Sequence, residues 1–250
     1  MKRALLLTTL LVSPALGADL PKAVPLKAAP VVAPYSGFYF FAGGGMGTAA
    51  QESIITQNGL NVSTAAGFNN LKAHPTGALV DAGIGVVAPT AIGKVGAEFD
   101  ANFIFSQASQ DCATGMGCFG RSRNAFLLQP KILYSPFPTP MAWTGWQWTK
   151  TLDAFVTAGV PLRELSACLS TSMTTEACDT AWLYGWSVGA IVEFPIYQQA
   201  SLRLVYDHNS YAGSISHDGS GIFGPGGLNL QNNMKVVNED LFKVQVKYSF

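Results

Sequence analysis

One short segment carries side chains that could perform acyl transfer. Residues 206–210 read Tyr-Asp-His-Asn-Ser, so His208 and Ser210 are two positions apart. Alternate residues of an extended strand project to the same side, and these two therefore share a face. Asp240 begins the last strand-like run, and its parity puts it on the same side. A serine nucleophile, a histidine base and a carboxylate that orients the histidine are the components of an acyl-transfer site.

The same residues also have a simpler interpretation. A histidine and a serine at the edge of a strand are ordinary polar groups where a strand meets a loop. A three-residue motif has little specificity on its own. Two hypotheses therefore stand for His208, Ser210 and Asp240: an acyl-transfer site, and surface polar groups without a catalytic role.

The four cysteines form two close pairs. Cys112 and Cys118 share one segment, and Cys168 and Cys178 share another. Four cysteines allow three connectivities, and two local disulfides are the simplest of these in an exported protein. Neither pair has a second Cys or His set at zinc-ligand spacing. We predict no metal site and no cofactor.

The start of the chain has the pattern of a secretory signal peptide. A basic beginning, Met1-Lys2-Arg3, precedes an apolar run over 4–12, and Ala-Leu-Gly follows at 15–17. The apolar run is far shorter than the ~20 residues of a spanning helix, so we predict cleavage after residue 17. Residues 18–36 are rich in proline and are predicted to form an extended leader.

From residue 37 onward the chain alternates strand-like runs with turns or loops. None of these runs is a continuous apolar helix candidate, so a membrane-spanning form of this chain must be a barrel. The runs number about eight, within the range of transmembrane barrels. We place them near 37–46, 76–88, 91–106, 121–135, 151–163, 181–194, 200–211 and 240–250.

The connections between the runs alternate in length. Short turns near Pro89-Thr90 and at 197–199 follow the second and sixth runs, and the odd-numbered runs precede long segments at 47–75, 107–120, 164–180 and 212–239. Long outer loops and short periplasmic turns have this order, which predicts periplasmic termini. The exception is 136–150, rich in proline and tryptophan, which is either an oversized turn or an additional short strand.

Each run has one apolar face and one face of polar or small residues. In the third run, apolar residues from Val95 to Phe103 alternate with a set from Lys94 to Asn102. A soluble barrel would put the apolar face inside. The polar face, however, is rich in glycine, which suits a crowded interior, and charged residues are only 12% of the chain, too few for a soluble surface. We predict an all-β fold, an antiparallel transmembrane β-barrel over 37–250.

The predicted interior carries charges of both signs. A barrel of about eight strands is just wide enough for its own side chains to fill it. Buried charges must pair, so the set predicts an internal ion-pair plug, with a narrow porin-like channel as the alternative. The set is Asp81, Lys94, Glu98, Asp100, Arg123, Lys131, Asp153, Glu193, Arg203, Lys243 and Lys247.

The final run, 241–250, is the most regular. Its apolar residues fall on alternate positions and end on Tyr248 and Phe250. This pattern resembles the closing strand of bacterial outer-membrane barrels, in which a terminal Phe is the signal for the barrel-assembly machinery. The resemblance gives that role to Phe250, with Tyr248 beside it.

Two further motifs extend this resemblance. The chain reads Ala-Asp-Leu-Pro at 18–21 and Tyr-Ser-Gly-Phe-Tyr at 35–39. Both are similar to segments of small alphaproteobacterial outer-membrane proteins with an OmpA-like eight-stranded barrel. The resemblance implies an envelope protein, often a major surface antigen or structural component, without catalytic residues.

A different resemblance concerns the His-x-Ser motif. Outer-membrane lipid A deacylases carry such a motif on the outer surface of an eight-stranded barrel, with an acid just before the C-terminus. His208, Ser210 and Asp240 match these positions. Tyr211 departs from the family, which has Asn after the serine, and weakens the oxyanion-hole argument. This resemblance implies a lipid A acyl hydrolase as an alternative function.

Charge and location narrow the partners. Basic and acidic residues are equal in number, 15 of each, so the chain has no basic excess for nucleic acid. We expect a monomer in the bacterial outer membrane, in contact with its lipid and lipopolysaccharide. The expected function is structural or surface-exposed and non-enzymatic.

Overall fold

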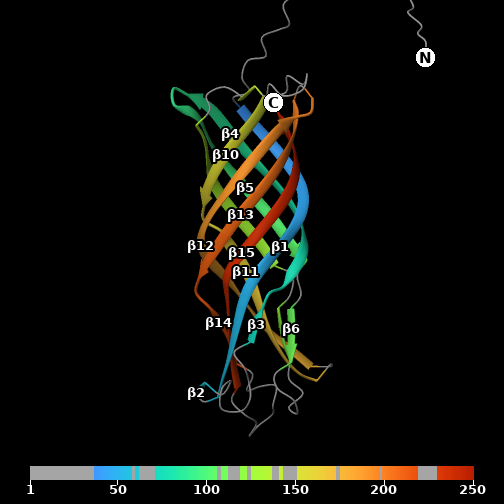
Figure 1. The fold of residues 1–250 in the computed structure, drawn as a ribbon. Helices are drawn as coiled ribbons and strands as arrows, with labels where there is room; N and C mark the ends of the chain where they lie inside the picture. The colour runs from blue at the N-terminus through green and yellow to red at the C-terminus, as the bar shows by residue number, and fades with distance from the viewer. Residues whose placement is uncertain are drawn as a thin grey trace, which may run out of the picture. The chain divides into compact units, whose positions relative to one another are not determined.

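The computed structural model describes the barrel region of the chain (Figure 1). The signal-peptide and leader predictions, over 1–17 and 18–36, fall outside the described residues. The described residues are 37–57, 60–61, 71–105, 108–111, 119–122, 125–136, 141–142, 151–172, 175–197, 199–218 and 230–250.

The described elements are all β-strands. Among the described residues, no helix is long and apolar enough to cross a membrane. The barrel wall is built from β1 (Gly37–Gln57), β4 (Thr76–Thr90), β5 (Gly93–Phe105), β8 (Ala125–Ser135), β10 (Thr151–Gly159), β11 (Leu162–Ser172), β12 (Thr175–Pro195), β13 (Ala200–Ala212) and β15 (Leu230–Ser249). The short strands are β2 (Leu60–Asn61), β3 (Leu71–Ala73), β6 (Ala108–Asp111), β7 (Phe119–Ser122), β9 (Met141–Ala142) and β14 (Ile215–Asp218).

The wall closes on itself as an eight-stranded antiparallel barrel, which confirms the predicted fold class. Consecutive wall strands pair along the chain, and β1 then pairs with β15 to close the ring. The β1–β15 register runs from Tyr39 opposite Ser249 to Gln57 opposite Leu230, with a shift between Ala50 and Gln51. Closure leaves no free edge along the wall, which is the structural requirement for a barrel in lipid.

Strands β10 and β11 act as one wall strand with an interruption between them. Both pair with β12 on one side and with β8 on the other. Val160 and Pro161 separate them, and the Val160 N–H donates to the Pro130 carbonyl of β8 at 3.1 Å. Pro130 has no N–H to return, so the ladder is weakened here.

Sheet replaces much of what the sequence analysis assigned to long loops. Strand β1 continues to Gln57 and β15 begins at Leu230, so the pair extends well past the predicted ends. Beyond Ala50 both faces of β1 carry polar residues, and the apolar alternation on which the prediction relied disappears. Backbone pairing persists there without that pattern.

The short turns lie close to their predicted positions. Between β4 and β5 the turn occupies 91–92, just after Pro89-Thr90, and Gly93 follows at a φ of 139°, which favours glycine. Between β12 and β13, the Ile196 N–H donates to the Ala200 carbonyl at 2.9 Å. In the proline- and tryptophan-rich segment, β9 pairs with the start of β10, and most of that segment lies outside the described residues.

Inward and outward faces alternate along every wall strand. Apolar side chains project outward, and Ile84, Val156 and Phe242 are each more than half exposed. Inside, Gly83 and Gly85 of β4 lie opposite Phe41 and Tyr39 of β1. A Cβ on either glycine would come within 2.3 Å of the facing aromatic ring. These glycines therefore make room for the rings in the crowded interior.

Candidate functional site

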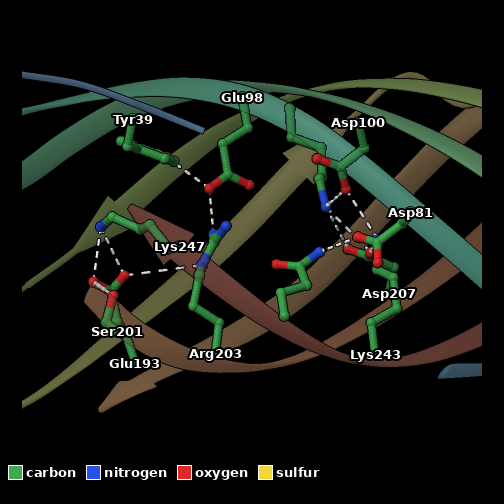
Figure 2. Close-up of polar contacts among 12 residues, drawn as sticks. Tyr39, Asp81, Glu98, Asp100, Glu193, Ser201, Arg203, Asp207, Lys243 and Lys247 are labelled. Atoms are coloured by element: carbon green, nitrogen blue, oxygen red, sulfur yellow. Dashed lines mark hydrogen bonds and ion pairs between the residues drawn. The ribbon is translucent and has the colours of Figure 1, made fainter. Parts of the chain in front are cut away.

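The centre of the barrel holds a cluster of two lysines and two aspartates from four strands. Lys131 Nζ lies 2.7 Å from Asp100 and 3.2 Å from Asp207. Lys243 Nζ lies 2.9 Å from each of the same carboxylates. All four side chains are fully buried. Asp81 lies beside this cluster in Figure 2 and accepts a hydrogen bond from Gln245.

A second network lies nearer the end of the barrel where β1 begins and β15 ends. The Arg203 guanidinium pairs with Glu98, and its Nε lies 3.8 Å from Glu193. Lys247 also pairs with Glu193, at 2.8 Å. The Tyr39 hydroxyl donates to Glu98 at 2.6 Å (Figure 2). Each buried charge of this network has an opposite charge in contact.

Further pairs flank these two networks. Lys94 and Asp153 lie 2.7 Å apart, near the end of the barrel that carries the β4–β5 turn. Towards the other end, Arg163 pairs with Glu239, and the Tyr211 hydroxyl donates to Glu239 at 2.7 Å. Removing one partner of such a buried pair leaves an uncompensated charge. Loss of one of these interior charges should therefore lower the stability of the barrel.

Apolar clusters also fill the interior, beside the charged networks. This differs from the predicted inward face of polar or small residues, because bulky apolar side chains also point inward. Leu127, Ile191 and Leu241 have no exposed surface. The clusters are formed by Tyr39, Phe41, Val87, Leu133, Phe155, Ile191 and Val205; by Leu79, Ile104, Ala125, Leu127 and Leu241; and by Ala49, Leu165, Leu183, Ile215, Met234 and Val236.

The structure brings most of the predicted interior set together. The described members line the interior, and Arg123 lies outside the described residues. Asp207, Arg163 and Glu239 were not predicted as members of the set. The sequence did contain a basis for predicting them. Alternate residues of a strand share a face, so Asp207 lies on the same side as Arg203, Arg163 on the same side as Asp153, and Glu239 on the same side as Lys243.

The candidate acyl-transfer residues His208, Ser210 and Asp240 lie on the outward face of β13 and β15. His208 and Asp240 are directly opposed in the register. His208 Nδ1 and Asp240 Oδ1 are 2.8 Å apart, and the Tyr206 hydroxyl donates to the same oxygen at 2.8 Å. The ring of Trp186 stands 5.8 Å from that of His208. Asp240 thus orients both the imidazole and the phenol.

Ser210 takes a different position from the one a complete triad needs. Its hydroxyl donates to the Val237 carbonyl at 3.5 Å. Val237 lies at the register shift of β15, where Ala50 faces Asn238 and Gln51 faces Val236. A bulge of this kind redirects nearby groups and is frequent beside active sites. The histidine–acid half of the triad is formed, and the serine contacts the backbone.

The C-terminal aromatics form a cluster on the outer wall. The ring of Phe40 lies 5.6 Å from Tyr248 and 5.8 Å from Phe250, and the last two rings are 5.6 Å apart. The Phe250 N–H donates to the Phe38 carbonyl at 3.2 Å. The terminal residue is thus held in the seam that closes the barrel.

The cysteine predictions fall partly within the described residues. Cys168 and Cys178 are directly opposed in the register of β11 and β12. Cys112 and Cys118 lie outside the described residues. Across the part of the chain that the structure describes, no group of three or more His, Cys, Asp and Glu side chains could hold a metal ion.

Comparisons with known proteins support the fold. No protein-family model and no curated protein sequence matches the chain. The outer membrane protein OprG from Pseudomonas aeruginosa aligns with a TM-score of 0.52 at 11% identity, over 86% of this chain and 98% of that one. At this identity the likeness shows the fold alone, which is that of outer-membrane β-barrel proteins.

Two other solved structures align less closely. A major outer membrane protein from Thermus thermophilus has a TM-score of 0.46 at 12% identity, over 85% of this chain and 99% of that one. Neisserial surface protein A has a TM-score of 0.41 at 11% identity, over 86% and 98%. Neither alignment adds to the fold assignment that the closed wall and the OprG alignment already give.

Proposed function

We propose that this chain is an integral protein of the bacterial outer membrane with a structural or surface-exposed role and no enzymatic activity. The observation that carries the proposal is the distribution of polarity: ion pairs lie inside a closed wall, and apolar side chains lie outside. A wall of this kind is stable in lipid and unsuited to water.

The filled interior supports a scaffold rather than a conduit. Ion pairs and apolar clusters fill the interior together, and Asp100, Gln129 and Asp207 have no exposed surface. A barrel of about eight strands has room for its own side chains and little else. The narrow porin-like channel remains an alternative that conductance measures directly.

The protein contacts outer-membrane lipid and lipopolysaccharide through its apolar wall, functions as a monomer, and is delivered by barrel-assembly machinery that recognises Phe250. A surface-antigen role fits the extension of β1 and β15 beyond the apolar part of the wall.

Cell fractionation and planar-bilayer recording test these statements. We expect the protein in the outer-membrane fraction, in a compact form that migrates faster on a gel before boiling than after it. Reconstituted protein should give no single-channel conductance. Recovery in the soluble fraction would contradict the membrane location, and stepwise currents would favour the channel.

A lipid A acyl hydrolase is a second candidate, favoured by the 2.8 Å contact between His208 and Asp240 on the outer wall. In this mechanism the Ser210 hydroxyl rotates away from Val237 and attacks the ester carbonyl carbon, while His208 Nε2 takes its proton. The ester C–O bond breaks and the departing alcohol receives that proton. Water, deprotonated by His208, then hydrolyses the acyl-serine and releases the fatty acid.

Mass spectrometry of lipid A distinguishes the two candidates. Cells with and without the protein should show the same number of acyl chains if the role is structural. A chain lost in the presence of the protein and retained with Ser210→Ala would establish the hydrolase. A loss that persists with Ser210→Ala would point to another enzyme of the host.

A further inference from the structure

The outer wall carries an apolar groove directly beside the His208–Asp240 pair. The groove has a volume of about 580 Å³, within the ~300–1,000 Å³ of small-molecule sites. It extends over β12, β13, β15 and β1, and its outward lining residues include Met46, Val192, Leu204, Tyr206, Phe242 and Val244.

The groove arises from the sizes of neighbouring outward side chains. In one row across the register, Ala190 lies beside Tyr206, which lies beside Phe242 and then Met46. The Tyr206 and Phe242 rings are 4.9 Å apart and tilted by 38°. Large side chains thus stand next to a small one, and the wall is hollowed between them.

The outward face changes from apolar to polar at one end of this groove. On β15 the outward residues from Phe250 back to Phe242 are all apolar or aromatic, and the next is Asp240. On β13 the outward residues Leu202, Leu204 and Tyr206 precede His208. The groove therefore ends at side chains that form hydrogen bonds, as an amphiphile would require.

The polar end is suited to a donor group. Asp240 Oδ1 accepts from Tyr206 and contacts Nδ1 of His208, so the neutral imidazole presents Nε2 as an acceptor. No partner for Nε2 is found among the described residues. A carboxylate and an imidazole nitrogen that accepts hydrogen bonds suit a hydroxyl or amide N–H, which donates. They do not suit a phosphate, which is an anion and itself accepts hydrogen bonds.

We propose that this groove binds one acyl chain of a membrane lipid whose amide or hydroxyl group hydrogen-bonds to His208 and Asp240. The inference rests on the proposed membrane location of the barrel, and it does not require hydrolysis. Tyr206 serves both parts of the site, because its ring lines the groove and its hydroxyl holds Asp240.

Photo-crosslinking in vesicles tests the site. Full-length protein is reconstituted in phosphatidylcholine vesicles with a small fraction of diazirine-tagged lipid, either an N-acyl glycolipid or phosphatidylcholine itself. We expect the glycolipid to label β13 and β15 peptides around Leu204 and Phe242 several-fold more than the rest of the wall. Phosphatidylcholine, which lacks donor groups, should label the exposed wall evenly.

Three variants sharpen the result. Leu204→Trp fills the groove and should abolish the selective labelling, and His208→Phe should reduce it by removing the acceptor. Phe99→Trp, at an exposed outward position on β5 away from the groove, is the matched control and should leave labelling unchanged. Even labelling by the glycolipid, or labelling that survives Leu204→Trp, would overturn the proposal.

The outcomes separate this inference from the function proposed above. Failure to insert into vesicles as a compact barrel would contradict the membrane location itself. Insertion with even labelling would contradict the groove alone. Selective labelling that persists in Ser210→Ala, with unchanged lipid A, would support lipid binding without hydrolysis.

Discussion

At the scale of single residues, strand parity decides which side chains enter the barrel. Asp100 and Lys131 were predicted inside from alternation alone, and the structure places them 2.7 Å apart. Parity does not give partners across the barrel, because these depend on the stagger between strands. Asp207 lies an even number of residues from Arg203 and therefore shares its inward face. It is absent from the predicted interior set because its neighbours His208 and Ser210 drew attention to the outward face of the same strand.

The central cluster should be sensitive to loss of one charge. Lys243→Met leaves Asp100 and Asp207 with Lys131 as the remaining lysine of the cluster, and an uncompensated buried charge costs about 3–5 kcal/mol. We expect the free energy of unfolding, measured by urea titration in detergent, to fall by that amount.

An exposed ion pair provides the matched control for this variant. Lys235 lies 2.7 Å from Glu52, with its side chain 44% exposed, and such pairs contribute ~0–1 kcal/mol. Lys235→Met should therefore leave the unfolding midpoint almost unchanged. Equal losses for the two variants would show that the central charges are solvated.

A disulfide between Cys168 and Cys178 is expected from their opposed positions on β11 and β12. Closing so short a loop stabilises by ~2–3 kcal/mol in the chain-entropy model. Peptide mapping without reduction should recover the linked peptides, and Cys178→Ser should lower the free energy of unfolding. Intact protein that gives both cysteines as free thiols would contradict the bridge.

At the scale of elements, the sequence located all the wall strands but not all of their ends. The apolar alternation ends near residue 46 in β1, whereas pairing continues to Gln57. Alternation of apolar and polar residues along a strand shows which face meets lipid and which meets the barrel interior. No such alternation exists where both faces of the strand are polar. Hydrogen bonding between two backbones needs no such pattern, so the outer extension could not be predicted.

The pairing of β1 with β4 depends on two interior glycines. Gly85→Val would place a branched side chain where a Cβ already comes within 2.3 Å of the Tyr39 ring, and overpacking of this kind typically costs about 1–3 kcal/mol or more. We expect a reduced yield of the compact, heat-modifiable form. Ala82→Val, at an outward position of the same strand, should assemble normally, and equal yields of the two variants would argue against a packed interior.

At the scale of the whole molecule, closure converts local alternation into a barrel with a definite inside. Composition predicted the orientation of the faces, because the charges are too few for a soluble surface and the glycines of the polar face suit a crowded interior. It could not predict that apolar clusters would pack beside the ion pairs inside, since inward positions such as Leu127 and Leu241 break the simple polar pattern.

Closure itself is testable across the β1–β15 seam. Ala42 and Val246 are directly opposed on the outward face, and opposed Cβ atoms lie ~4.5–5.5 Å apart. With the native cysteines changed to serine, Ala42→Cys with Val246→Cys should form an intramolecular disulfide in the assembled protein, detected by mass spectrometry of the linked peptides. Ala42→Cys with Leu202→Cys is the control, because Leu202 faces Val246 from the far side of β15, and two strand spacings of ~4.8 Å exceed the reach of a disulfide. A bridge in the first variant and none in the second requires that β1 and β15 meet, whereas an open sheet would leave both pairs reduced.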